Sequence, residues 1–203
     1  MKDKKVIGIT GPYCAGKNHI ALLLEQRLLP VLDPDKLGHE VIEEEKERLV
    51  KRFGEDILGP QGLVDRRRLG DKVFGKPAEL AALEEMIHPE VNRKTIEWIN
   101  SRKEKACVIN AALLHRSSAF ELLDAVIIVE APFITRLIRA KKRDRLPYRA
   151  LIKRFQSQRH FNYQFFEGKT DIYRVKNSLR SSLRNKLGKR IDEILSLLGI
   201  TRV

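Results

Sequence analysis

The chain has 203 residues, of which 42% are hydrophobic and 33% charged, so it is expected to fold as a soluble globular protein with one sizeable core. Its apolar runs are too short to span a bilayer, and the N-terminus lacks the apolar stretch of a signal peptide, so no membrane partner is expected. The net charge of +13 indicates an anionic partner, either nucleic acid or a phosphorylated small molecule.

The first predicted elements form a strand–loop–helix–strand unit. Residues 5–10 (KVIGIT) are a β-branched run that leads into a glycine, which is typical of a buried parallel strand. Residues 18–29 are apolar at helical spacing and are ended by Pro30, and residues 30–33 predict a second short strand. This order predicts an α/β fold with a parallel sheet.

The middle of the chain is predicted to be helical. Helices are expected at residues 35–54, 65–74 and 77–87. Asp35 would cap the first of them and Gly54 would end it, residues 55–64 read as a turn or loop, and Pro89 would interrupt a helix or start a new one. Because residues 35–104 carry little strand signal, they are predicted to be a helical insertion in the α/β core.

Two further buried strands and a basic region follow. Strands are expected at residues 106–110 and 124–130, a helix from Pro132, and a final helix at residues 183–198. Between Arg136 and Arg190 the chain has eighteen Lys or Arg residues against three acidic ones. This excess predicts either a solvated helical face, a lid over bound phosphate, or a nucleic-acid patch.

Residues 11–18 (GPYCAGKN) fit a phosphate-binding loop, G-x-x-x-x-G-K, between a strand and a helix. Gly11 and Gly16 permit the backbone angles with which successive N–H groups surround a phosphate at the positive end of the helix. Lys17 would bridge the β- and γ-phosphates as a point charge. The loop therefore predicts a nucleotide site.

Asn18 stands where such loops normally have a Ser or Thr that ligates Mg²⁺. An amide oxygen also ligates hard cations, but it lies one bond further from the backbone. We therefore hypothesise that Mg²⁺ binding at Asn18 is weakened or mediated by water.

Two carboxylates, Asp33 and Asp35, follow the second predicted strand. Ligands of open α/β sheets bind beyond the carboxyl ends of the strands, where carboxylates could hold the waters of Mg²⁺ or accept a proton from an attacking hydroxyl. The alternative is that Asp35 only caps the following helix. Both roles stay open at this point.

Other candidates are single side chains. Arg139 and Arg143 lie four residues apart, hence on one helix face, and are candidates for neutralising phosphate charge. His88 is either structural or a substrate ligand. The two cysteines, Cys14 and Cys107, lack metal-like spacing and favour a reducing, cytoplasmic setting. The start of the helix is expected to lower the pKa of the Cys14 thiol.

The sequence resembles the dephospho-coenzyme A kinases over residues 6–158. VLDPDKLGHEV is similar to the family's strand-two motif, which has an Asp-Ala-Asp core, and RLIRAKKRD to the start of its lid. The hallmarks of the middle region occur in order as Phe53-Gly54, Asp65-Arg66, Val73-Phe74, Leu83-Glu84 and His88-Pro89. The loop departs from the family's usual Gly-Gly-Ile-Gly-Ser-Gly-Lys-Ser/Thr-Thr, and Asn110-Ala111-Ala112 replaces its usual proline-containing segment.

The resemblance implies transfer of the ATP γ-phosphate to the ribose 3′-hydroxyl of dephospho-CoA, with Mg²⁺. It implies that Asp35 is the general base with Asp33 beside it, that Lys17, Arg139 and Arg143 act on the phosphates, and that His88 lies in the substrate domain. The ATP site would comprise Gly11, Pro12, Tyr13, Cys14, Ala15, Gly16, Lys17, Asn18 and His19.

The expected architecture is a three-layer P-loop kinase core with a helical CoA-binding insertion and a basic lid. The core would comprise residues 1–34, 105–138 and 165–203, the insertion residues 35–104, and the lid residues 139–164. Two alternatives stay open: another nucleoside or nucleotide kinase on the same scaffold, and a catalytically impaired P-loop protein that binds nucleic acid through its basic face.

Overall fold

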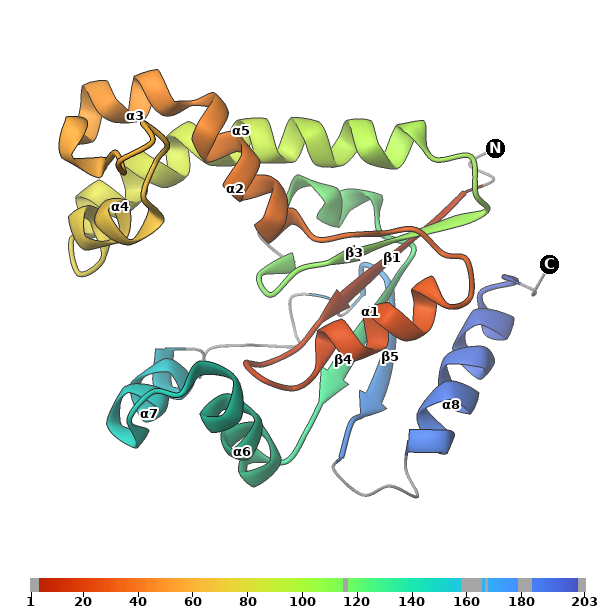
Figure 1. Ribbon diagram of the computed structural model, residues 1–203. Helices are drawn as coiled ribbons and strands as arrows, with labels where there is room; N and C mark the ends of the chain where they lie inside the picture. Colours follow the sequence, from red (N-terminus) through yellow and green to blue (C-terminus); the bar gives the residue numbers. More distant parts are fainter. Residues whose placement is uncertain (1–3, 115–116, 158–165, 167, 179–183, 201–203) are drawn as a thin grey trace. The chain divides into compact units, whose positions relative to one another are not determined.

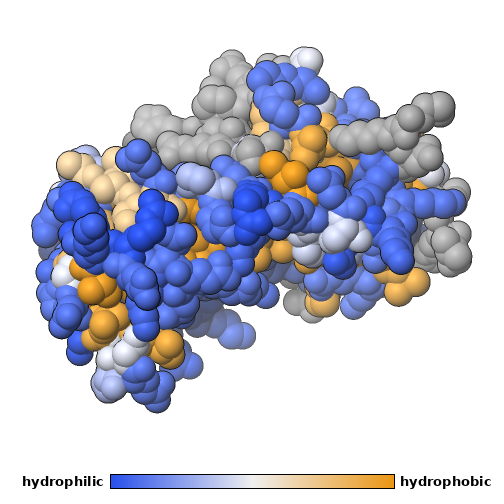
Figure 2. Space-filling model, turned by 90° about the horizontal axis from the view of Figure 1, so that it is seen from above, coloured by the Kyte–Doolittle hydropathy of each residue, from blue (hydrophilic) through white to orange (hydrophobic). Residues whose placement is uncertain are grey.

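The computed structural model describes residues 4–114, 117–157, 166, 168–178 and 184–200. Its contacts divide the chain into two compact units, one formed by Met1–Leu32 with Ser101–Val203 and the other by Asp33–Asn100. Figure 2 shows a mostly hydrophilic surface on the visible face, with the hydrophobic residues in separate small areas. Among the described helices, none has both the length and the apolar character that crossing a membrane requires.

The first unit is built on a five-stranded sheet (Figure 1). The strands are β1 (Lys5–Thr10), β2 (Val31–Leu32), β3 (Ala106–Asn110), β4 (Ala125–Glu130) and β5 (Asp171–Lys176). They pair in the order β2-β3-β1-β4-β5, and every pairing is parallel. The predicted α/β fold class with a parallel sheet is therefore confirmed.

Two helices, α1 (Lys17–Glu25) and α8 (Arg184–Leu197), pack side by side against one face of this sheet (Figure 1). They bury their apolar positions against alternate residues of the strands, as a parallel sheet covered by helices requires. The helix residues in this core include Ile20, Ala21, Leu24, Leu187, Ile191, Ile194 and Leu195. The α1–sheet contact fixes the direction in which the start of α1 points.

The ends of β1 and β3 lie next to each other. Ile9 pairs with Asn110, and the Ala111 N–H donates to the Ile9 carbonyl at 3.1 Å. The Thr10 hydroxyl donates to the Ala112 carbonyl at 3.2 Å. Along the strand order, the chain runs from β1 to β2 in one direction and from β3 to β4 in the other. Open α/β sheets bind ligands at the carboxyl ends of two neighbouring strands whose connections diverge in this way.

Helix α1 ends four residues before the predicted boundary at residue 29. The Arg27 guanidinium donates to the Asp192 carboxylate of α8 at 2.6 Å and to the Leu23 carbonyl, and Leu28 takes a left-handed φ of 62°. Leu29 then turns into the core. Of the two leucines in this stretch, Leu29 is buried in the core, whereas Leu28 is exposed.

Helices α6 (Phe133–Asp144) and α7 (Tyr148–Ser157) pack against the loop that follows β1. Ala140, Leu151 and Phe155 form a small buried cluster on which Tyr13 and Cys14 pack. The rings of Tyr13 and Phe155 meet edge to face, with their centroids 5.2 Å apart. The basic segment predicted as a lid is thus helical in its described part, and residues 158–164 lie outside the described residues.

The second unit is helical around its own apolar core. It comprises α2 (Pro34–Glu44), α3 (Lys46–Phe53), the 3₁₀ turn η1 (Glu55–Ile57), α4 (Arg66–Val73) and α5 (Pro77–Ser101). The single helix expected at residues 35–54 is two helices that meet at Glu45. The expectation at Pro89 was wrong, because α5 continues through this proline. Burial of Ile87 and of the partly buried Met86 and Val91 in the unit's core offsets the lost backbone hydrogen bond.

Strand β5 and the short 3₁₀ helix η3 (Ser118–Leu122) were not predicted. In β5 only Val175 is fully buried, since this strand lies at the edge of the sheet. Its sequence, DIYRVK, therefore lacks the continuous apolar run of β3 and β4. The final helix is α8, and the predicted start at Leu183 lies outside the described residues.

Candidate active site

The loop between β1 and α1 depends on two glycines. Gly11 has φ +151°, and a Cβ there would lie 2.3 Å from the Val129 carbonyl oxygen. Gly16 has φ +98°, and a Cβ there would lie 2.1 Å from the Asn177 amide nitrogen. A side chain at either position would meet both a strained backbone and a fixed neighbour. The loop therefore lies close to its surroundings at both ends.

The start of α1 is an open anion-binding terminus. The N-cap is Gly16, which has no side chain to cap the helix. Backbone N–H groups in the first turn of α1 can therefore donate to a ligand. Lys17 Nζ donates to the Gly11 carbonyl at 3.1 Å, which holds the ammonium group across the loop. Backbone amides and an ammonium group converge here, as phosphate binding requires.

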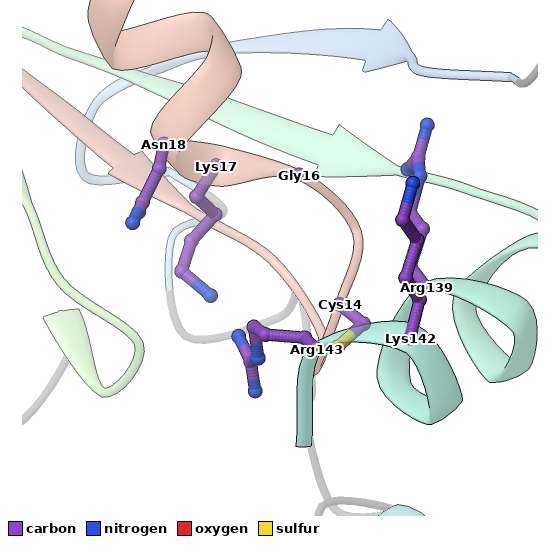
Figure 3. Close-up of a pocket in the computed structure, with 7 residues that line it drawn as sticks. All are labelled: Cys14, Gly16, Lys17, Asn18, Arg139, Lys142 and Arg143. Atoms are coloured by element: carbon purple, nitrogen blue, oxygen red, sulfur yellow. The ribbon is translucent and has the colours of Figure 1, made fainter. Parts of the chain in front are cut away.

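A hollow of about 350 Å³ opens beside this loop (Figure 3). Lys17 and Asn18 reach it from α1, and three cationic side chains reach it from α6. The lining residues are Cys14, Gly16, Lys17, Asn18, Arg139, Lys142 and Arg143. Four of these side chains are cationic, and none of the described lining residues is a carboxylate. The hollow is built for a ligand of high negative charge.

Arg139 holds the loop in place. Its guanidinium donates to the Ala15 carbonyl at 2.9 Å and to the Asn177 side-chain oxygen at 3.0 Å. Asn177, buried just after β5, donates its own amide to the same Ala15 carbonyl at 3.0 Å. Arg139 and Asn177 thus connect α6 and the end of β5 to the phosphate loop.

Arg143 has a different environment. Its guanidinium lies over the Tyr13 ring, 5.0 Å from the centroid, and donates to the Asp144 carboxylate at 2.7 Å. The same carboxylate accepts from the Tyr13 hydroxyl and from Arg154. Because the Arg143 side chain is 60% exposed, it can exchange this partner for a phosphate at little cost.

Asn18 is paired with another amide. The Asn110 side-chain nitrogen, at the end of β3, donates to the Asn18 side-chain oxygen at 3.1 Å. Among the described residues, no group of three or more His, Cys, Asp or Glu side chains is placed to hold a metal ion. Of the residues lining the hollow, only Asn18 has a side-chain oxygen, and that oxygen accepts the hydrogen bond from Asn110.

The expected effect on Cys14 was wrong in direction. Burial raises the pKa of the Cys14 thiol and outweighs the opposing effects of Arg143 and Lys17. Burial also raises the pKa of Cys107, to about 11. Burial therefore disfavours the thiolate form of both cysteines.

Slow alkylation of Cys14 follows from this pKa shift. Iodoacetamide should modify Cys14 more slowly at pH 8 than it modifies the same cysteine in an unstructured peptide, because less thiolate is present. The measurement is the modification rate against pH by mass spectrometry, with Cys107→Ala to leave one thiol. Faster reaction than the peptide would contradict the burial effect.

The family model of the dephospho-CoA kinases matches residues 5–165. The chain belongs to the dephospho-CoA kinase family. The dephospho-CoA kinase of Treponema pallidum is 32% identical over 206 residues, which cover 96% of each chain. The family is one of kinases that transfer phosphate from ATP.

Solved structures show the same fold. The crystal structure of TT1252 from Thermus thermophilus has a TM-score of 0.80 at 30% identity and covers 96% of this chain and 98% of its own. The dephospho-CoA kinase from Campylobacter jejuni has a TM-score of 0.66 at 23% identity, with coverage of 97% and 98%. At that identity the second likeness supports the fold alone.

The candidate residues of the dephospho-CoA kinase site fall into two groups. The loop from Gly11 to His19 lies in the first unit with Arg139 and Arg143. Asp33, Asp35 and His88 lie in the second unit. Asp33, and not Asp35, is the N-cap of α2, because its carboxylate accepts from the Asp35 N–H at 3.1 Å. Asp35 and His88 are exposed on α2 and α5.

Three residues near the hollow were missed as site residues: Asn110, Lys142 and Asp144. Lys142 follows Arg139 by three positions, so helical spacing from the two chosen arginines could have indicated it. Asn110 contacts Asn18 across 92 positions and Asn177 contacts Arg139 across 38, and no local pattern carries such pairings.

Arg139→Ala and Arg143→Ala should separate stability from activity. Loss of Arg139 leaves the buried Asn177 oxygen without this donor and should lower the free energy of unfolding by about 1–2 kcal/mol. Loss of the exposed Arg143 should change it by less than about 0.5 kcal/mol and lower turnover instead. Denaturant unfolding and steady-state kinetics check both. If the two variants lowered the free energy of unfolding equally, Arg139 would not have the structural role described here.

Proposed function

We propose that this protein transfers the γ-phosphate of ATP to the ribose 3′-hydroxyl of dephospho-CoA, giving coenzyme A and ADP. The observation that supports it most is the family match over residues 5–165, joined to a phosphate loop with four cationic side chains around one hollow. The two free thiols agree with a reaction in the reducing cytoplasm.

In this proposal the phosphates of ATP lie along the loop and the start of α1. Lys17 leaves the Gly11 carbonyl and contacts the β- and γ-phosphates, and Arg143 leaves Asp144 to face the transferred group. Arg139 positions the loop through Ala15 and has no need to touch the reacting atoms. These cations offset the negative charge that shifts toward the leaving ADP.

The acceptor side of the proposal rests on the second unit. The 3′-hydroxyl oxygen bonds to the γ-phosphorus as the bond from that phosphorus to the β–γ bridging oxygen breaks, and its proton passes to the Asp35 carboxylate. Asp33 holds the start of α2 and so orients Asp35. His88 and the helical insertion, residues 35–104, are proposed to bind dephospho-CoA, and residues 139–164 to act as the lid that excludes water.

Magnesium enters the proposal as the counter-ion of ATP. Mg²⁺ commonly keeps several water ligands and binds substrate phosphates, so Mg·ATP can be held without a protein ligand in the hollow. When bound it would neutralise phosphate charge.

The test is phosphoryl transfer from Mg·ATP by the purified protein, with CoA and ADP measured by mass spectrometry. Turnover with dephospho-CoA is expected, and none with adenosine or nucleoside monophosphates. The matched control is 3′-deoxy-dephospho-CoA, which lacks only the acceptor oxygen. Transfer to a nucleoside monophosphate in preference to dephospho-CoA would overturn the proposal in favour of a nucleotide kinase.

A further inference from the structure

The amide pair between α1 and β3 gives Asn18 a defined orientation. Asn110 lies at the carboxyl end of β3 with its side chain almost fully buried, 6% of the residue being exposed. Its amide nitrogen donates to the Asn18 oxygen at 3.1 Å. Because the Asn18 oxygen is turned toward Asn110, its N–H₂ group is turned away from Asn110. Asn18 lines the hollow beside Lys17 (Figure 3).

The pairing of Asn110 with Asn18 leaves one polar atom of Asn110 without a partner among the described residues. The Asn110 side-chain oxygen is buried and accepts no hydrogen bond from any described residue. A buried acceptor without a donor costs about 1–3 kcal/mol, so such a group requires an explanation beyond stability. Fixing the orientation of Asn18 supplies that explanation.

The chemistry of the hollow indicates which end of Asn18 is used. Its other polar side chains are the donors Lys17, Arg139, Lys142 and Arg143, which suit phosphate oxygens. A metal ligand at Asn18 would have to be the oxygen, and that oxygen faces the Asn110 N–H₂ group, whose positive hydrogens disfavour a cation beside it.

We propose that Asn18 binds a phosphate oxygen of the nucleotide as a hydrogen-bond donor and is not a ligand of Mg²⁺, and that Asn110 is the positioning residue that fixes this orientation. The inference rests on the proposed binding of ATP at this loop. It replaces the earlier hypothesis of weakened metal ligation by Asn18 with a different role for the same side chain. The reverse pairing, in which Asn18 donates to Asn110, would instead turn the Asn18 oxygen toward the ligand.

The test measures ATP binding without any acceptor, by calorimetry, in EDTA and in Mg²⁺. Asn18→Ala should weaken binding by a similar factor, about tenfold, in both buffers, because a donor to phosphate acts with or without metal. A loss confined to the Mg²⁺ buffer would show that Asn18 is a metal ligand and would overturn the proposal.

Asn110→Asp forces the reverse pairing, because a carboxylate at 110 only accepts hydrogen bonds. Asn18 should then donate to residue 110, and its oxygen should face the nucleotide. Affinity in EDTA is expected to fall by about tenfold or more and to be regained in Mg²⁺. An unchanged ratio of the affinities in the two buffers would overturn the proposal.

Asn100→Asp, an exposed amide in α5 that does not line the hollow, controls for the change in net charge and should leave both affinities unchanged. Thermal unfolding of each variant shows whether it is folded. If binding follows these expectations but dephospho-CoA is not phosphorylated, the proposed reaction fails and this inference stands. If the unaltered protein binds no ATP in either buffer, both fail.

Discussion

Lys17→Met should lower turnover with dephospho-CoA by about 10²–10³-fold while ATP binding weakens far less. The Gly11 carbonyl holds the ammonium group across the loop at 3.1 Å, from where it moves to the β- and γ-phosphates when the nucleotide binds. Charge develops between the β- and γ-phosphates during transfer, and a cation there stabilises the transition state more than the ground state. Binding persists because three other cations line the hollow.

The measurement compares kcat with the dissociation constant of ATP. Lys153→Met is the matched control, because it removes one positive charge from an exposed position of α7 that does not line the hollow. If both variants lost turnover equally, the effect would reflect the overall positive charge and not the position of Lys17.

Asp35→Asn should reduce turnover by about 10²–10⁴-fold and leave ATP binding within about twofold. The amide has the size of the carboxylate but does not accept a proton from the attacking hydroxyl. Helix α2 should be retained, because its N-cap is Asp33 and the substitution keeps the backbone N–H that Asp33 accepts.

Asp71→Asn, at an exposed position of α4, controls for the loss of one negative charge in the same unit. Thermal unfolding should be unchanged in both variants. Parallel losses of turnover and of ATP binding in Asp35→Asn would indicate that Asp35 is structural, and the general base would have to be sought elsewhere.

The sequence predicted the buried strands and the phosphate loop because local chemistry defines them. β1, β3 and β4 are continuous apolar runs, and the loop needs Gly11 and Gly16 where its backbone approaches Val129 and Asn177. The edge strand β5 was missed because only one of its residues is buried. A strand is recognisable as a continuous apolar run only when both of its faces are buried, as in β3 and β4.

Two of the errors, at the end of α1 and at Cys14, come from contacts between distant positions. The end of α1 is set by Arg27 and Asp192, which are 165 positions apart. The pKa of Cys14 follows its burial against α6 and α7, and not the helix start on which the expectation rested. The Asp33 cap, by contrast, was locally readable, since Pro34 suits the first helical position and moves the cap one residue earlier.

The packing of Tyr13 on Phe155 has a consequence for changing the loop sequence. The family's usual loop carries small or aliphatic residues where this chain has Tyr13 and Cys14. Grafting that sequence here would remove the ring that meets Phe155 and the hydroxyl that donates to Asp144. The graft would leave a void beneath α7 and would remove one hydrogen-bond donor from the Asp144 carboxylate that also binds Arg143. Loop and α7 are therefore interdependent, and a productive exchange must transplant both together.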